Sequence, residues 1–323
     1  MTITRAPCKD APAIPITRFN NSIFQEDWWL DAVAPGAWHA IEIGSGQDIQ
    51  ARLPYVVSRY PLFTSIRQPF FTQTLGPWYR PQGGKHATEL SREHDLAREL
   101  VSRLPASDFF SMNFHHSVTN WLPYTWLGFD AVPKVTYVID RLGTKEQLWD
   151  GLKDNIRREI KKAEKRVEVA RSADVDLFVE MNRKTFKRQQ MDIPYSPAAL
   201  RRVDAACVAR GARQMYFARD EQQRIHAALY IVGDERCAYY LLGGADPALR
   251  TSGAMSLLMW NAMLDASTTS VGFNFEGSVI QTIERFLRAF GGEQKTYMNV
   301  RRASWKGNLA LAVKDGVGAI RRE

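Results

Sequence analysis

The chain has 323 residues, of which 45% are hydrophobic and 24% charged, and it contains 9 Trp, 11 Tyr and 16 Phe. This length and composition suit about two folded domains, and they exclude collagen-like, disulfide-stapled and intrinsically disordered proteins. A formal charge of +8 favours anionic partners such as nucleotides, coenzyme A (CoA), RNA or a lipid headgroup surface, although many basic proteins bind none of these.

Cysteine usage and the lack of long apolar runs indicate where the protein works. Cys8, Cys207 and Cys237 are far apart and have no Cys or His neighbours at the spacing of a metal site. This pattern is typical of a reducing compartment, and we expect no metal. No run of residues has the length and apolarity of a signal peptide or a membrane-spanning helix. We therefore expect a cytoplasmic protein.

The first half of the chain predicts a tail and then one domain. Residues 1–19 mix Pro, Ala and charge without a period, which is typical of a flexible tail. The following block, 20–134, contains segments that alternate as strands do and one segment with helical Leu spacing. Its predicted strands are 38–43, 49–58 and 108–114, and its predicted helix is 86–104. The aromatic segment 121–129 is typical of packing between domains.

A second block, 135–305, opens with a predicted strand at 134–140 and a long amphipathic helix at about 144–167. Thr144 and Gln147 form a capping-box pattern, and Leu148, Leu152, Ile156 and Ile160 then recur every fourth residue. Further elements follow in the order helix, helix, three strands, helix, strand, helix, strand. Their ranges are 174–190, 196–211, 214–220, 224–233, 237–245, 253–266, 270–275, 279–290 and 294–302. Residues 306–323 are a predicted C-terminal helix or tail.

Four stretches in this second block carry a resemblance to a known family. They are LKDNIRREIKKA at 152–163, YYLLGGA at 239–245, NFEGS at 274–278 and FLRAFGG at 286–292. Together with the order of elements, they resemble the GNAT-type domain of the FemABX-like family. The first block looks like the first of that family's two GNAT-like halves. The resemblance implies an α+β fold of two tandem GNAT-like domains, each with a mixed, mostly antiparallel sheet flanked by helices.

The resemblance also implies transfer of an acyl or aminoacyl group to an amine, from acyl-CoA or from aminoacyl-tRNA. Residues 250–255 resemble the family's donor loop, with Arg250 and Gly253 in place and Met255 where a small residue is usual. A helix N-terminus carries unpaired N–H groups that bind phosphate. We expect Arg250, Ser252, Gly253 and Ala254 to hold the donor, although a capped helix start without a ligand has the same local sequence.

A run of basic residues lies on the predicted helix 144–167. Residues four apart lie on one face of a helix, so one stripe contains Arg157, Lys161 and Lys165. Arg158 lies on the neighbouring stripe. With Arg157, Arg158 and Lys161 at its centre, this ridge is a candidate site for donor or acceptor phosphates. Interleaved Glu residues are equally typical of a solvated face with internal ion pairs.

Glu276 is the sharpest catalytic candidate, because it lies where an apolar strand turns towards a helix through a Gly. A carboxylate there could take the proton of the attacking amine if burial raises its pKa. It could also orient the acceptor ammonium, cap the next helix or anchor a loop. Tyr240 could protonate a thiolate leaving group, and of Tyr239 and Tyr240 one should belong to the core.

His115 and His116 point to opposite faces if they lie in a strand, and no partner for a triad or metal is spaced near them. We interpret both, and His226, as structural.

The leading hypothesis is an N-acyltransferase, with acyl-CoA favoured as donor and a small-molecule or peptide amine as acceptor, in cell-envelope, polysaccharide or peptide biosynthesis. One alternative is a Fem-type ligase that uses aminoacyl-tRNA, and another is a non-catalytic basic binding module. Further expectations are tRNA or peripheral membrane contact and no DNA binding.

Overall fold

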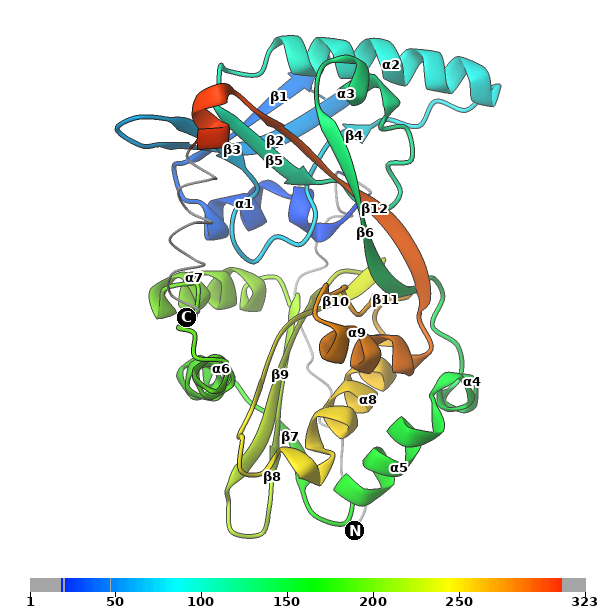
Figure 1. Ribbon diagram of the computed structural model, residues 1–323. Coiled ribbons are helices and arrows are strands. Elements are labelled where there is room, and N and C mark those ends of the chain that lie inside the picture. Colours follow the sequence, from blue (N-terminus) through cyan, green and yellow to red (C-terminus); the bar gives the residue numbers. More distant parts are fainter. Residues whose placement is uncertain (1–18, 20, 47, 310–323) are drawn as a thin grey trace. The chain divides into compact units, whose positions relative to one another are not determined.

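The computed structural model describes residues 19, 21–46 and 48–309, which fold as two compact units (Figure 1). Unit 1 contains residues 154–271. Unit 2 contains residues 19–153 together with the chain from 272 onwards. Each unit has a sheet flanked by helices, which confirms the predicted α+β class. Residues 1–18 of the predicted tail and most of the predicted segment at 306–323 lie outside the described residues. Phe19, the last residue of the predicted tail, is instead buried against Ile49 and Trp78.

Unit 1 is built on an antiparallel sheet in the order β10-β9-β8-β7. Its elements are α5 (Asp154–Ala163), β7 (Glu168–Arg171), α6 (Val175–Arg188), α7 (Pro197–Val208), β8 (Arg213–Arg219), β9 (Ile225–Gly233), β10 (Cys237–Ala245), the 3-10 turn η2 (Arg250–Ser252) and α8 (Ala254–Ala266). A Cβ built on Gly243 would approach α8, and one on Gly244 would approach α6. The two helices therefore cover opposite faces of the sheet, because successive residues of a strand point to opposite sides. The predicted three-strand meander is confirmed.

Unit 2 combines residues from both ends of the chain. Its sheet runs β1-β2-β3-β5-β12-β6-β11, with β4 beside β2 and with β3 and β5 parallel. Its elements are η1 (Ile23–Gln25), α1 (Asp27–Val33), β1 (Trp38–Ile43), β2 (Ala51–Arg59), β3 (Thr64–Arg67), β4 (Trp78–Tyr79), α2 (His86–Ser102), β5 (Phe109–Asn113), α3 (Leu122–Trp126), β6 (Asp130–Ile139), α4 (Lys145–Gly151), β11 (Gly272–Asn274), α9 (Gln281–Leu287), η3 (Arg288–Phe290) and β12 (Glu293–Ala303). Figure 1 shows β6 and β12 running side by side, and their pairs extend from Val138 and Glu293 to Asp130 and Arg301.

The division into units differs from the expected domain boundary at 134/135. That boundary falls inside β6, one uninterrupted strand whose two ends both pair with β12. The contacts instead divide the chain at 153/154 and at 271/272. The reason is that β6 and β12 are long paired strands from distant parts of the sequence, and backbone pairing ties them into one sheet.

The predicted helix 144–167 is wrong as one element. The chain forms α4 and then α5, and Leu152 between them is extended, with ψ 141°. Gly151 packs against the backbone of Gly291, and the extended Leu152 lets the N–H of Lys153 donate to the carbonyl of Ala289. The four apolar residues of the pattern are all buried, as expected, and the predicted capping box is present. Tertiary contacts therefore decide the break, because the local spacing is compatible with a continuous helix.

Gly253, at the start of α8, lies where α5 and α8 pack together. It has a φ of 83°, in the left-handed region, and a Cβ built on it would lie 2.3 Å from the carbonyl oxygen of Glu159 in α5. Only glycine satisfies both the dihedral angle and the close approach.

We predict that Gly253→Ala destabilises the protein more than Gly211→Ala. Gly211 has a φ of 62° and no atom within 4 Å of a built Cβ, so its variant isolates the dihedral penalty, on the order of 1 kcal/mol. The clash with Glu159 should add about 2 kcal/mol or more for Gly253→Ala. Urea unfolding measures both variants. If both variants lose the same free energy of unfolding, the close packing of α5 against α8 is contradicted.

Candidate functional site

Glu276 is held by a backbone crossing in unit 2. After β11, the carbonyl oxygen of Glu276 accepts from the N–H of Tyr137, and a Cβ built on Gly277 would lie 1.7 Å from the carbonyl oxygen of Val135. Glu276 itself has a φ of 63°, which is strained for a residue with a side chain. Because α9 begins at Gln281, Glu276 does not cap that helix. The crossing therefore fixes the carboxyl at the end of β11.

Glu276 lines a polar pocket of about 230 Å³. The pocket takes residues from the loop after β3, from β5 and the loop after it, from β6 and from β12. The lining residues are Gln68, Thr72, Gln73, Thr74, Asn113, His116, Thr136, Asn274, Glu276, Gly277 and Tyr297. Most of these side chains are uncharged hydrogen-bonding groups. Such a lining suits a small, strongly polar ligand.

Burial shifts the pKa values of three titratable groups in the pocket, Glu276, Tyr297 and His116. Burial raises the pKa of the Glu276 carboxyl well above its ordinary value. Burial and the negative charge of Glu276 raise the pKa of Tyr297 to about 12, so its hydroxyl is a donor at neutral pH. Burial lowers the pKa of His116, with Lys295 adding to the shift and Asp140 opposing it. The imidazole is therefore biased towards its neutral form.

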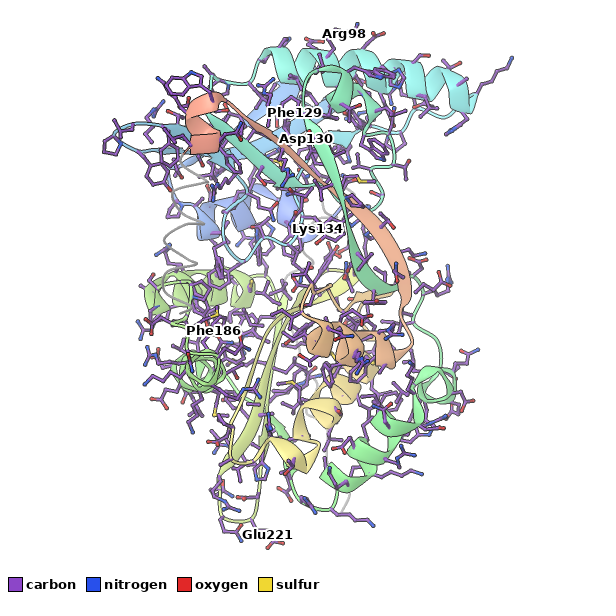
Figure 2. All side chains as sticks on the ribbon, in the orientation of Figure 1. Arg98, Phe129, Asp130, Lys134, Phe186 and Glu221 are labelled. Carbon is purple, nitrogen blue, oxygen red and sulfur yellow. The ribbon has the colours of Figure 1, made fainter. Side chains whose placement is uncertain are left out.

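Hydrogen bonds hold the amide side chains around Glu276. The Oδ1 atom of Asn274 accepts from the hydroxyl of Thr136 at 2.6 Å and from the N–H of Glu276 at 2.8 Å. The Nδ2 group of Asn274 then remains as a donor. On the other side of the pocket, the Oδ1 atom of Asn113 accepts from Lys134 at 3.3 Å, and Lys134 is labelled on β6 in Figure 2. These bonds preorganise the polar groups before a ligand arrives.

His116 belongs to this pocket, which the sequence did not reveal. Because β5 ends at Asn113, the two histidines do not alternate as strand residues, and their rings lie 4.1 Å apart. His115 is buried and its Nδ1 lies 2.8 Å from the hydroxyl of Ser117, so its structural interpretation fits. Tyr297 was also missed, since nothing in its local sequence separates it from other strand tyrosines.

We predict that Glu276→Gln changes how stability depends on pH. The folded carboxyl has a raised pKa, so its contribution is fully present below the ordinary pKa of the unfolded chain and is lost as pH rises towards the folded pKa. Relative to the Gln variant, the wild-type free energy of unfolding should fall by about 1.4 kcal/mol for each pH unit between those two values. Denaturant unfolding from pH 4 upwards measures it, with exposed Glu293→Gln as control. If the free energies of unfolding of wild type and Glu276→Gln change with pH in parallel, Glu276 is well solvated.

The expected donor loop forms the start of α8 in unit 1. Ser252, Gly253 and Ala254 are buried, whereas Arg250 is exposed. The hydroxyl of Ser252 accepts from the N–H of Ala254 at 3.3 Å. It therefore satisfies one of the N–H groups that a helix N-terminus leaves without an intrahelical partner. The structure thus brings these four residues together in one short segment, and their role in donor binding stays a prediction.

A groove of about 820 Å³ lies beside this loop, entirely within unit 1. Its walls are the chain after α5, the β8–β9 hairpin, whose tip residue Glu221 is labelled in Figure 2, and residues 248–252. Lys165, Arg166 and Arg219 line it and form no ion pair with described residues. Arg224 is instead paired with Asp220 at 2.7 Å. Burial raises the pKa of the Asp220 carboxyl, but hydrogen bonds from His226 and Arg224 outweigh burial and lower this pKa to about 2.

Tyr240 is half-buried on β10, whereas Tyr239 is buried in the core, as the sequence suggested for one of the pair. A Cβ built on Gly243 would lie 2.5 Å from the Tyr240 hydroxyl and 3.3 Å from Cε of Met255. The Met255 side chain therefore packs towards β10 and Tyr240. A register shift after Tyr240 marks a bulge at this point of the strand.

The basic ridge is shorter than expected, because α5 ends at Ala163 and Lys165 lies beyond the helix. Arg157 forms an ion pair with Asp154 at 2.6 Å, and Lys162 forms one with Glu159 at 2.6 Å. Arg158 and Lys161 are exposed. Part of this face is therefore internally neutralised, and its binding of phosphates stays a prediction.

Within residues 19, 21–46 and 48–309, no three His, Cys, Asp or Glu side chains are grouped so that they could hold a metal ion. In the same residues, no helix has the length and apolarity needed to cross a membrane.

Part of the chain is similar to a known family. Residues 151–276 match the family model described as an acetyltransferase (GNAT) domain. No curated protein matches the chain. The crystal structure of FemX is 12% identical with a TM-score of 0.62, and the match covers 85% of this chain and 91% of FemX.

Two other solved structures have the same fold at lower scores. A tandem GNAT protein from the clavulanic acid biosynthesis pathway is 10% identical with a TM-score of 0.50, covering 84% of this chain and 85% of that one. L-PGS from Bacillus licheniformis is 10% identical with a TM-score of 0.51, and the match covers 88% of this chain and 90% of that one. These findings confirm the expected resemblance to FemABX-like GNAT proteins and the tandem GNAT-like fold.

Proposed function

We propose that this protein transfers an acyl group from an acyl-CoA to a polar primary amine, because residues 151–276 match an acetyltransferase (GNAT) domain model and 85% of the chain has a fold similar to that of FemX. The observation that carries the proposal is Glu276. Its carboxyl lies in a small polar pocket, on a strained backbone, with a raised pKa. Perturbed carboxyls in polar pockets are typical of acid–base sites.

Glu276 is the general base of this reaction. A primary amine attacks the thioester carbonyl once it has lost its proton, and a carboxylate whose pKa is closer to neutrality takes that proton more effectively. The new C–N bond forms as the C–S bond breaks. CoA leaves as the thiolate, and the sequence-based role of Tyr240 as its proton donor stays a prediction. No covalent enzyme intermediate is needed, because the donor is already activated.

The acceptor pocket favours a ligand with several hydrogen-bonding groups. Asn274 and Tyr297 supply donors near Glu276, and Gln68 and Asn113 supply further amide groups. A volume of about 230 Å³ suits a group the size of an amino sugar or a short peptide end. Such amines occur in cell-envelope, polysaccharide and peptide biosynthesis, and we propose an acceptor of this kind.

The groove in unit 1 favours acyl-CoA over aminoacyl-tRNA. Lys165, Arg166 and Arg219, which form no ion pair with described residues, line the same groove as Ser252, and this arrangement fits the compact phosphate chain of CoA. Recognition of tRNA needs a broader field of basic side chains. The α5 face, where such a field was expected, is partly neutralised by Asp154 and Glu159.

Replacing Glu276 by Gln should lower kcat by about 100-fold or more at saturating acetyl-CoA, because the amide cannot accept a proton. Release of CoA is followed with a thiol reagent in the presence of amino sugars, lysine peptides and polyamines. Glu293→Gln, an exposed carboxylate on β12, is the matched control and should keep wild-type turnover. Full activity of Glu276→Gln would exclude the base role.

Replacing Arg219 or Arg166 by Ala should weaken CoA binding about tenfold each, since each variant removes one charge-assisted contact. Calorimetric titration with CoA at two salt concentrations measures this. Arg98→Ala on α2, an exposed arginine of unit 2, is the control. Wild-type protein that binds aminoacyl-tRNA with a steep salt dependence, and does not bind CoA, would favour the Fem-type ligase instead.

A further inference from the structure

The β2–β3 hairpin and the turn after β12 present large apolar side chains to solvent. Leu62 is 86% exposed, Trp305 73%, Leu309 60% and Tyr60 51%. We call these four residues the apolar patch. Single exposed apolar residues are ordinary on protein surfaces, but several large ones on neighbouring segments mark an interaction surface.

A backbone hydrogen bond and a stacked pair of rings shape the hairpin tip. The N–H of Tyr60 donates to the carbonyl of Phe63 at 2.9 Å, which closes a four-residue turn with Pro61 and Leu62 at its apex. The rings of Tyr60 and Phe63 are stacked with centroids 4.4 Å apart. This packing holds the tip open, so that Leu62 points away from the sheet's core rather than folding back onto it.

Asp108 ties the two parts of the apolar patch together. One of its carboxylate oxygens accepts from the N–H of Thr64, directly after Phe63, at 3.0 Å. The other accepts from the hydroxyl of Ser304, directly before Trp305, at 2.9 Å. Both bonds lower the pKa of Asp108, so the link persists at neutral pH. The hairpin and the segment after β12 therefore lie side by side in unit 2, as Figure 1 shows for the blue hairpin and the red helical turn.

Basic side chains flank the apolar patch. Arg59 and Arg67, at the two sides of the hairpin, are exposed and form no ion pair with described residues. Lys306 is exposed, and its ammonium lies 5.7 Å from the centre of the Trp305 ring. The carboxylate of Asp108 is occupied by its hydrogen bonds. The surface thus combines apolar and aromatic tips with positive charge.

We propose that the apolar patch docks the protein on the anionic surface of a lipid bilayer. Leu62 enters the boundary between headgroups and acyl chains, and Tyr60 and Trp305 lie at headgroup level, where amphipathic rings are favoured. Arg59, Arg67 and Lys306 are attracted to anionic headgroups. The occupant is a lipid surface rather than an apolar protein groove, because the exposed cations Arg59 and Lys306 directly adjoin Tyr60 and Trp305 and would be desolvated against an apolar partner.

Sedimentation of the full chain with large vesicles tests the proposal. Vesicles of phosphatidylcholine alone are compared with vesicles that contain about one third phosphatidylglycerol, at low and high salt. We expect binding to the anionic vesicles, weakened by salt, and little binding to the neutral ones. The double variant Leu62→Ser with Trp305→Ser should reduce the vesicle partition coefficient by about tenfold or more.

Matched variants separate the contributions of the basic and the apolar side chains to vesicle binding. Arg59→Gln with Arg67→Gln should remove most of the salt-dependent binding, whereas Trp126→Ser, an exposed tryptophan on α3 outside the apolar patch, should bind as wild type. Circular dichroism melting checks that each variant folds. The proposal is overturned if wild-type protein ignores anionic vesicles, or if the double variant binds them as well as wild type.

Light scattering addresses the competing occupant, a second copy of this chain. If the protein dimerises, and Leu62→Ser with Trp305→Ser abolishes the dimer without any effect on vesicle binding, the apolar patch is a self-association surface and the proposal is wrong. Neither outcome depends on acyl transfer, so failure here and failure of the proposed function are distinguishable.

Discussion

The close crossing of residues 276–277 over β6 is the constraint on which the candidate site depends. Gly277 has no room for a side chain beside the carbonyl of Val135, and this contact forces Glu276 into the left-handed region. A strained residue persists only where the surrounding structure over-determines it. Here β11 pairs with β6 next to the crossing, and β6 in turn pairs with β12 over a long stretch of backbone. The backbone therefore places the carboxyl, and among the described residues no ion pair holds it.

The electrostatics of this carboxyl differ from those of Asp220 and Asp108. Hydrogen bonds from His226 and Arg224 lower the pKa of Asp220, and hydrogen bonds lower that of Asp108. Glu276 receives no such compensation, so burial alone raises its pKa. The neighbouring hydroxyl and amides of Tyr297, Asn274 and Asn113 offer hydrogen bonds without positive charge. An incoming ammonium group would supply the missing partner, which is consistent with an amine acceptor.

The sequence by itself determined most elements of the fold, and it singled out Glu276 in the candidate site. Binary patterning located the meander of β8, β9 and β10, because strand alternation and short polar turns are local signals. The Thr144 capping box and the apolar positions from Leu148 to Ile160 were also correct, since they record which side chains face the core. Glu276 could be singled out because a carboxylate after an apolar strand and before a Gly is chemically conspicuous.

Only the tertiary structure decided where the long helix breaks, which segments form each unit and which residues surround Glu276. The break after Gly151 follows from its contact with Gly291, 140 positions away. The pairing of β6 with β12 is equally non-local, and so is the meeting of His116 and Tyr297 in one pocket. Propensity and periodicity describe neighbours along the chain, whereas a pocket is made of neighbours in space. Its geometry is fixed by backbone contacts between distant segments, which a single sequence does not display.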